Sequence, residues 1–328
     1  MWDVVALGEV LIDFTPEGKN DQGAALFSCN PGGAPANVLA MNAKLGGKTA
    51  VIGKVGRDAF GDLLRRTLLE NGVDVEGLVT DSKIPTTLAF VQLSQAGERT
   101  FTFYRKPGAD LLLTFEDVKR EWIDLCRIFH FGSVSLTGEP ARSATLKTAS
   151  YAKEQGKLIS FDPNYRPFLW ESREDAKAQI QKGISLADLV KVSEEELILV
   201  TGTSDRQLGS ERLLEQGASL VLVSLGEKGA FYRNHAGSGL VPAWPVTTMD
   251  TTGAGDAFLG AMHWLLRGMR AEEIGDLPPE KMEELVAFAN AAGGLTTEKK
   301  GAIPALPGVE EILQKTGRPI PPSGSRTV

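Results

Sequence analysis

The chain alternates between short apolar runs and longer segments in which apolar residues recur at helical spacing. The apolar runs predict buried strands at residues 4–7, 49–55, 128–131, 158–161, 189–192 and 220–224. The amphipathic segments predict helices at residues 35–45, 58–71, 141–155, 254–266 and 279–295. Strands that alternate with helices indicate an α/β fold with a mainly parallel central sheet flanked by helices.

One region breaks this alternation. Residues 88–94 and 100–104 are strand-like and flank the turn 95–98, which predicts a β-hairpin and therefore antiparallel pairing. We expect residues 9–30 to supply the partner strands. The sequence thus predicts one α/β domain over residues 1–320, with a small antiparallel sheet inserted from roughly 9–31 and 85–106 as a lid. The Pro-, Ser- and Gly-rich tail, residues 321–328, is predicted to be mobile.

Composition excludes several classes of protein. The 328 residues are 42% hydrophobic and 23% charged, which is ordinary for a globular protein, and the net charge of −7 argues against nucleic acid as a partner. Cys29 and Cys126 are too few for a disulfide scaffold. The N-terminal segment lacks the basic residues of a signal peptide, and no apolar stretch approaches the roughly 18 residues of a membrane span. We therefore expect a cytoplasmic protein.

The sharpest chemical signal is DTTGAGDAFLGAM at residues 250–262. A small, flexible turn precedes an apolar helix, so backbone N–H groups and the positive end of the helix dipole can form an anion hole for a transferring phosphoryl group. Asp256 lies in the first turn and can accept a proton from an attacking hydroxyl. We expect the helix N-terminus to keep Asp256 ionised and weakly basic, which suffices because phosphoryl transfer asks mainly for positioning. By itself, the pattern is equally compatible with a glycine-rich turn whose Asp stabilises the helix dipole.

Other segments carry weaker signals. GGAPAN at residues 32–37 opens a helix, and its glycines permit close approach of a ligand while Asn37 offers a donor and an acceptor to hydroxyls. Asp13 follows the first strand, near the edge where open α/β sheets bind ligands. Arg105 and Arg166 end strand segments and suit the capture of an anion. Each alone is also explained as a helix entry, a solvated acid or a surface cation.

Two further segments have good structural explanations of their own. Ser193 and Glu196 have the spacing of a capping box at a helix start, just after Lys191. Residues 224–229 form a glycine-containing turn between strands, which a plain hairpin explains.

Several familiar motifs are missing. Residues 47–49 imitate the end of a P-loop, but Asn42 stands where that motif requires Gly, and no GxGxxG follows a strand. The scattered histidines His130, His235 and His263 do not indicate zinc, and no GxSxG supports a serine hydrolase.

Taken together, GGAPAN and DTTGAGDAF resemble the two signatures of the ribokinase-like (PfkB) carbohydrate kinase family. The resemblance runs in order from about residue 4 to residue 307, and FYRKPGADLLL, DPNYRPFLW and VKVSEEEL are most similar to fructokinase segments. It implies a ribokinase-like three-layer fold and use of ATP with Mg²⁺, and it leaves a dependence on K⁺ open. It also implies transfer of phosphate to a sugar primary hydroxyl, with D-fructose converted to fructose 6-phosphate. An open apolar face on the lid sheet would favour a homodimer formed through the lid.

The resemblance assigns roles residue by residue. Asp256 matches the catalytic base, and Gly253, Ala254 and Gly255 match the anion hole. Sugar-binding positions are matched by Asp13, Gly32, Gly33 and Asn37, and active-site arginines by Arg105 and Arg166. Nucleotide-side positions are matched by Lys191, Glu196, Ser224, Gly226, Gly229 and Asn290. A monovalent-cation site is matched by Asp250, Thr252 and the loop 296–301. One departure is Ser193, where the family usually has Asn.

Three alternatives stay open at this point. A 2-keto-3-deoxygluconate kinase would have the same fold, with Arg105 and Arg166 holding the substrate carboxylate. A non-catalytic sugar sensor would also bind sugar, although the intact GAGD argues against it. A dehydrogenase is disfavoured because the dinucleotide fingerprint is missing.

Overall fold

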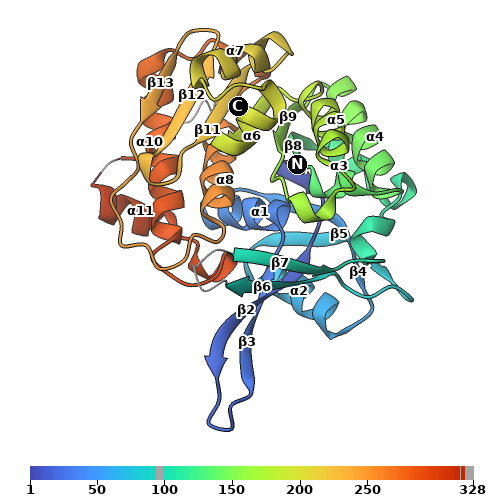
Figure 1. Ribbon diagram of the computed structural model, residues 1–328. Helices are drawn as coiled ribbons and strands as arrows, with labels where there is room; N and C mark the ends of the chain where they lie inside the picture. The colour runs from blue at the N-terminus through green and yellow to red at the C-terminus, as the bar shows by residue number, and fades with distance from the viewer. Residues whose placement is uncertain (94–98, 318, 322–328) are drawn as a thin grey trace.

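The computed structural model describes residues 1–93, 99–317 and 319–321. Within these residues a nine-stranded central sheet lies between two layers of helices, and a separate four-stranded sheet lies at one end of the molecule (Figure 1). The predicted α/β architecture with a mainly parallel central sheet is therefore confirmed.

The central sheet has the strand order β13-β12-β11-β10-β9-β8-β1-β4-β5. All neighbours pair in parallel except β11–β12 and β12–β13, which are antiparallel. The strands are β1 (Trp2–Leu7), β4 (Thr49–Gly56), β5 (Val73–Asp81), β8 (Cys126–Gly132), β9 (Leu158–Asp162), β10 (Leu189–Ser193), β11 (Leu220–Ser224), β12 (Ala230–Asn234) and β13 (Ser238–Val241).

Helices cover both faces of this sheet, so its inner strands are apolar on both sides. In β1, Val4 and Ala6 point into one hydrophobic core, and Val5 and Leu7 point into the other. The first core is closed by α1 (Ala34–Lys44), α2 (Ala59–Glu70), α8 (Ala254–Leu266), α9 (Ala271–Gly275), α10 (Pro279–Thr296) and α11 (Val309–Thr316). The second is closed by α3 (Arg120–Asp124), α4 (Ala141–Glu154), α5 (Arg173–Ile184), α6 (Glu194–Thr201) and α7 (Arg206–Glu215).

Short 3₁₀ helices occupy several of the connections. They are η1 (Ala109–Leu112), η2 (Phe115–Asp117), η3 (Val134–Thr137), η4 (Pro167–Leu169), η5 (Gly226–Lys228) and η6 (Ile303–Ala305). Among the described residues, no helix combines the length and the apolar character that crossing a bilayer requires.

The small sheet has the strand order β3-β2-β6-β7 (Figure 1). Its strands are β2 (Leu11–Lys19), β3 (Ala25–Gly32), β6 (Leu88–Leu93) and β7 (Arg99–Tyr104). The β2–β3 and β6–β7 pairs are antiparallel, while the central β2–β6 pair is parallel. The strands of the predicted hairpin are present. Its turn, residues 95–98, and the tail after residue 321 lie outside the described residues.

Chain connectivity brings the small sheet to the carboxyl edge of the central sheet. β1 runs directly into the turn at residues 8–10 and then into β2, while β9 and β10 end at the same edge because they are parallel to β1. Ligands of open α/β sheets bind at this edge.

Candidate active site

A cavity of about 580 Å³ lies between the small sheet and the carboxyl edge of the central sheet. One wall comes from the small sheet, and the opposite wall comes from the turn 249–256 and the loop after β9. Of the sequence-predicted site residues, those that line the cavity are Asp13, Gly33, Asn37, Arg166, Lys191, Asp250, Thr252, Gly253, Gly255 and Asp256.

The N-terminus of α8 opens into this cavity. Gly253 precedes the helix with φ of 78°, a left-handed conformation, and a Cβ on it would lie 2.8 Å from the Cβ of Ala302. Gly255 and Asp256 follow in the first turn and also line the cavity. Ala254 does not line it, and its N–H is directed to the carbonyl of Thr251 at 3.4 Å. The helix therefore presents its positive end to the cavity, as an anion hole requires.

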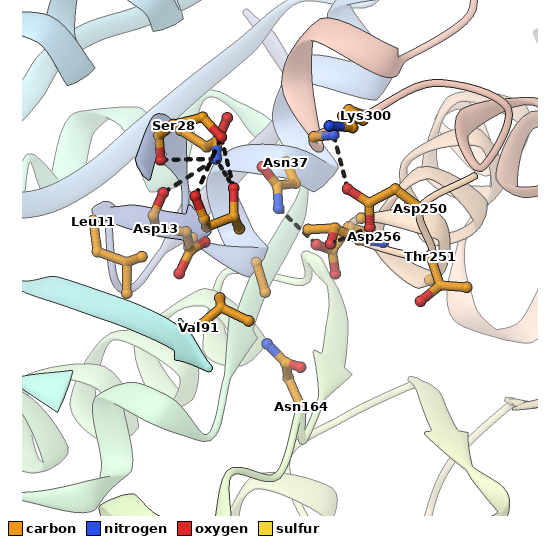
Figure 2. A pocket seen from close by; sticks show the side chains of 18 of the residues that line it. Leu11, Asp13, Ser28, Asn37, Val91, Asn164, Asp250, Thr251, Asp256 and Lys300 are labelled. Atoms are coloured by element: carbon orange, nitrogen blue, oxygen red, sulfur yellow. Dashed lines mark hydrogen bonds between the residues drawn. The ribbon is translucent and has the colours of Figure 1, made fainter. Parts of the chain in front are cut away.

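Asn37 holds the carboxylate of Asp256 from the neighbouring helix. α1 packs against α8, and the Asn37 side-chain amide donates to Oδ2 of Asp256 at 2.8 Å (Figure 2). Gly33 precedes α1 with φ of 111°, and a Cβ there would collide with the carbonyl oxygen of Glu9. The GGAPAN segment therefore fixes the side chain of Asn37 relative to the first turn of α8.

Burial raises the pKa of Asp256 above its ordinary value, and the bond from Asn37 and the charge of Lys191 offset this only in part. The expectation that the helix N-terminus would keep this pKa low is therefore wrong. The field of a helix end is modest, whereas removal of water penalises the charged carboxylate more strongly. Asp256 is consequently a stronger base, once ionised, than the sequence suggested.

Asp13 faces the same part of the cavity from β2 (Figure 2). Burial raises its pKa to about 6; the positive charge of Arg166 opposes this, and the negative charge of Asp256 reinforces it. Arg166 also lowers the pKa of Asp256. One guanidinium thus acts on two carboxylates that would otherwise repel each other.

Lys191 lies next to the start of α8 in a buried ion pair. Its Nζ is 2.7 Å from Oδ2 of Asp162, and an ideal Cβ on Gly255 would be 3.1 Å from that Nζ. Burial works to lower the pKa of Lys191, but the charges of Asp162, Glu196 and Asp256 together raise it. Lys191 therefore carries a fixed positive charge next to the start of α8.

Asp250 ties the turn before α8 to a distant loop. Its Oδ1 accepts from the N–H and Oγ1 of Thr252, at 3.0 and 2.7 Å, and its Oδ2 accepts from the N–H of Gly301 at 2.9 Å. The carboxylate thus organises the turn that precedes α8.

Arg105, predicted to bind substrate, does not line the cavity. It is buried and ion-paired with Asp110 at 2.6 Å, and it also donates to Oγ1 of Thr137 and to the carbonyl of Val134. The pattern of a cation after a strand could not distinguish a ligand-binding arginine from one that fastens the segment after β7 to η3.

The remaining predicted residues lie outside the cavity lining. Glu196 uses both carboxylate oxygens on backbone amides, those of Tyr165 and Ser193, each at 2.7 Å. Asn290 donates to the carbonyls of Val241 and Pro242 at 3.0 and 3.1 Å. Also outside the lining are Gly32, Ser224, Gly226 and Gly229.

Sequence reasoning missed several residues that line the cavity. Glu9 and Asn164 contribute polar groups, and so does Glu17 of the small sheet, which pairs with Lys300 of the predicted loop 296–301 at 2.8 Å. Asp162, the buried partner of Lys191, was also missed. Its place at the end of a predicted strand was a usable signal, whereas the pairing of Glu17 with Lys300 depends on how two distant segments pack.

The sequence matches the pfkB family of carbohydrate kinases over residues 1–308. Fructokinase-1 of Oryza sativa subsp. japonica is 46% identical over 314 residues, which cover 95% of this chain and 96% of the relative. A crystal structure of fructokinase from Xylella fastidiosa with bound ATP superposes with a TM-score of 0.90 at 35% identity, covering 97% of this chain and 99% of that one. Fructokinase from Vibrio cholerae O395, in its fructose-, ADP- and calcium-bound form, gives a TM-score of 0.84 at 35% identity, with coverage of 95% and 98%.

These similarities and the site define a sugar phosphotransferase. The chain belongs to the pfkB family of carbohydrate kinases and has the ribokinase-like fold.

Proposed function

We propose that this kinase transfers the γ-phosphoryl group of ATP to the primary hydroxyl of D-fructose and forms fructose 6-phosphate. The observation that carries the proposal is the arrangement of Asp256 at the N-terminus of α8, in a cavity that also contains hydroxyl-binding side chains. The fructokinases similar to this chain over nearly their whole length support the choice of sugar.

In the proposed reaction, Asp256 accepts the proton of the attacking hydroxyl. Its raised pKa strengthens it as a base, and Asn37 fixes one of its oxygens so that the other can face the acceptor. Asp13 and the backbone at Gly33 lie across the cavity and are suited to hold neighbouring hydroxyls. The proton therefore leaves the sugar at the atom that attacks the phosphorus.

Positive charge around the transferring phosphoryl group comes from three sources. Gly253 and Gly255 present the N-terminal end of α8 to the cavity, Lys191 lies close to Gly255, and Arg166 lines the same cavity from the loop after β9. A loose transition state spreads negative charge over the phosphoryl oxygens, and preorganised donors stabilise that charge.

The nucleotide is proposed to lie along the turn 224–229 and the segment fixed by Asn290. Asn290 holds the carbonyls of Val241 and Pro242, and Gly229 packs against the same segment. The ordered backbone of this segment supports the proposal that it lines the adenine.

We propose Mg²⁺ as the companion of ATP and K⁺ as a loop-stabilising ion. Mg²⁺ is usually held by one or two carboxylates and by substrate phosphates. Its positive charge would offset part of the negative charge on the phosphate oxygens. Asp162 and Glu196 lie close enough to Lys191 to affect its pKa and could order the ion's waters. Asp250 already accepts three hydrogen bonds, so carbonyl oxygens of the 250–252 and 296–301 loops would supply most of a K⁺ site.

The acidic-sugar alternative is disfavoured by Arg105. A substrate carboxylate needs a cation that faces the cavity, but Arg105 is directed to Asp110, Thr137 and Val134. Only Arg166 of that proposed pair lines the cavity. A neutral ketohexose therefore fits this site better than 2-keto-3-deoxygluconate.

We also propose that the protein is a cytoplasmic homodimer formed through the small sheet, which acts as a lid. Leu26, Phe27 and Tyr104 expose 45%, 44% and 64% of their surface on this sheet, and exposed apolar faces favour association. Sedimentation of the wild type and of Phe27→Ser tests this. A wild-type monomer at micromolar concentration would exclude the dimer.

The function is tested by measuring ADP release with a panel of sugars that includes fructose, glucose, ribose and 2-keto-3-deoxygluconate. We expect fructose to have the highest kcat/KM and the product to be the 6-phosphate by NMR. Preference for the acidic sugar would replace the proposal with its nearest alternative. Sugar binding without turnover would indicate a sensor.

A further inference from the structure

Glu9 is a buried carboxyl group beside the cavity that the proposed reaction does not use. It lies in the turn between β1 and β2 and is only 3% exposed, yet it belongs to the cavity lining. Its Oε1 accepts the N–H of Ala34, at the start of α1, at 3.1 Å. Its Oε2 is buried and has no hydrogen-bond partner among the described residues.

An unpartnered buried carboxyl oxygen is unfavourable unless another group satisfies it. The backbone N–H of Glu9 itself and, less strongly, the charge of Arg105 lower the pKa of Glu9, but Arg105 is already ion-paired with Asp110. Burial still raises the pKa of Glu9 to about 7, so near neutral pH the carboxyl can either accept or donate a hydrogen bond. Such a group suits a sugar hydroxyl, which also does both.

Glu9 and Asp13 respond to different charged neighbours. The charges of Arg105 and Asp110 change the pKa of Glu9, whereas those of Arg166 and Asp256 change the pKa of Asp13.

We propose that Glu9 is a specificity-determining residue. Its Oε2 accepts a hydrogen bond from a sugar hydroxyl other than the one that is phosphorylated, while Oε1 holds the backbone at Ala34 in place. The proposal rests on the proposed sugar kinase function and deepens it. A site that hydrogen-bonds a substrate hydroxyl rejects an analogue without that hydroxyl, because its own polar group is then left unpaired.

The test compares wild type with Glu9→Gln, which keeps a carbonyl for the Ala34 N–H but replaces Oε2 with an amide that only donates. We expect KM for fructose to rise by about tenfold or more, which is the usual effect of losing one hydrogen bond to a charged group. KM for ATP should stay nearly unchanged. Glu9→Met removes both interactions and serves as the second variant. A Gln variant with wild-type KM, beside a defective Met variant, would show that only the backbone anchor matters and would overturn the proposal.

Fructose analogues that each lack one non-reacting hydroxyl separate contact from mere positioning. In wild type, one analogue should have a kcat/KM about tenfold or more below that of fructose. In Glu9→Gln, this difference between fructose and the same analogue should largely disappear, while the differences for the other analogues stay as in wild type. An equal loss for every analogue in the variant would indicate a purely structural role.

A measurement on wild type alone covers the case in which the variants do not fold. If every deoxy analogue is used as well as fructose, no buried group reads a hydroxyl and the proposal fails. If wild type ignores fructose but phosphorylates another sugar, the proposed substrate is wrong, and the same series built on that sugar still tests Glu9.

Discussion

The side-chain amide of Asn37 donates a 2.8 Å hydrogen bond to Asp256, a residue 219 positions away in the sequence. The bond joins the two signature segments and connects the start of α1 to the start of α8. It favours the ionised form of Asp256 and opposes the effect of burial on its pKa.

Asn37→Ala should therefore raise the pKa of Asp256. Because the base works only when ionised, the acidic limb of the kcat/KM profile should move to higher pH. We expect at least tenfold lower activity near neutral pH, partly recovered in more alkaline buffer. Asn42→Ala is the matched control, since Asn42 is on the same helix but donates to the carbonyl of Gly260. An unshifted profile for Asn37→Ala would show that this bond does not tune the base.

Asp256→Asn should reduce turnover strongly and leave the binding of sugar and nucleotide nearly unchanged. Asn has nearly the same shape and cannot accept the proton, so we expect kcat to fall by about 10²–10⁴-fold, the usual contribution of a positioned acid or base. Calorimetric titration should give dissociation constants for fructose and for an ATP analogue within a few-fold of wild type. Near-normal turnover would remove Asp256 from the role of base.

Lys300→Ala should loosen the small sheet from the loop beside the anion hole. Lys300 pairs with Glu17 of β2 at 2.8 Å, and both line the cavity. An exposed pair contributes about 1 kcal/mol at most, so we expect KM for the sugar to rise no more than about fivefold, with faster ATP hydrolysis in the absence of sugar. The neighbouring Lys299→Ala is the control, because Lys299 pairs with Glu311 instead. Identical kinetics of the two variants would argue against a closing role.

Asp110→Asn should destabilise the fold. It leaves the buried guanidinium of Arg105 without its counter-charge, which typically costs about 3–5 kcal/mol. Urea unfolding measures the change. Glu76→Gln is the control, since its partner Lys119 is a third exposed and Glu76 itself mostly exposed, and a change within about 0.5 kcal/mol is expected. If the variant instead bound sugar much more weakly and kept the stability of wild type, the result would indicate that Arg105 takes part in sugar binding.

The buried histidines should make stability fall in acid. Ser160 hydrogen-bonds both His130 and His263, and burial lowers the pKa of His130 to about 3 and that of His263 well below its usual value. The unfolded chain binds protons more readily below about pH 6.5, so stability is complete above that pH and declines toward pH 3 by up to about 1.4 kcal/mol per pH unit for each histidine. His263→Gln, which can still reach Ser160, should flatten this dependence in urea titrations. His235 is exposed, so His235→Gln should leave the pH dependence of stability unchanged.

Local patterns were enough to predict most of the secondary structure. The helix predicted at 254–266 coincides with α8, and strand 220–224 with β11, because hydrophobic spacing reflects burial directly. The sequence patterns did not reveal β5, α3, α5, α7, α9, α11 or β13, and the hairpin expected around residues 224–229 implied β12 without giving its bounds. In α5 and α7 the apolar residues are few among charged ones, and β12 and β13 form an antiparallel edge that interrupts the strand–helix alternation.

For the site, the sequence by itself determined which segments carry the chemistry, because a glycine turn before a helix and a Pro at a helix start are local features of the chain. Only the tertiary structure decided that Arg105 is directed away from the cavity, that Glu9 retains an unpartnered oxygen beside it, and that the pKa of Asp256 is raised. Those properties depend on burial and on charges from distant parts of the chain. Desolvation and Coulomb interactions depend on which residues are close in space, whereas the spacing of residues along the sequence reports only local structure.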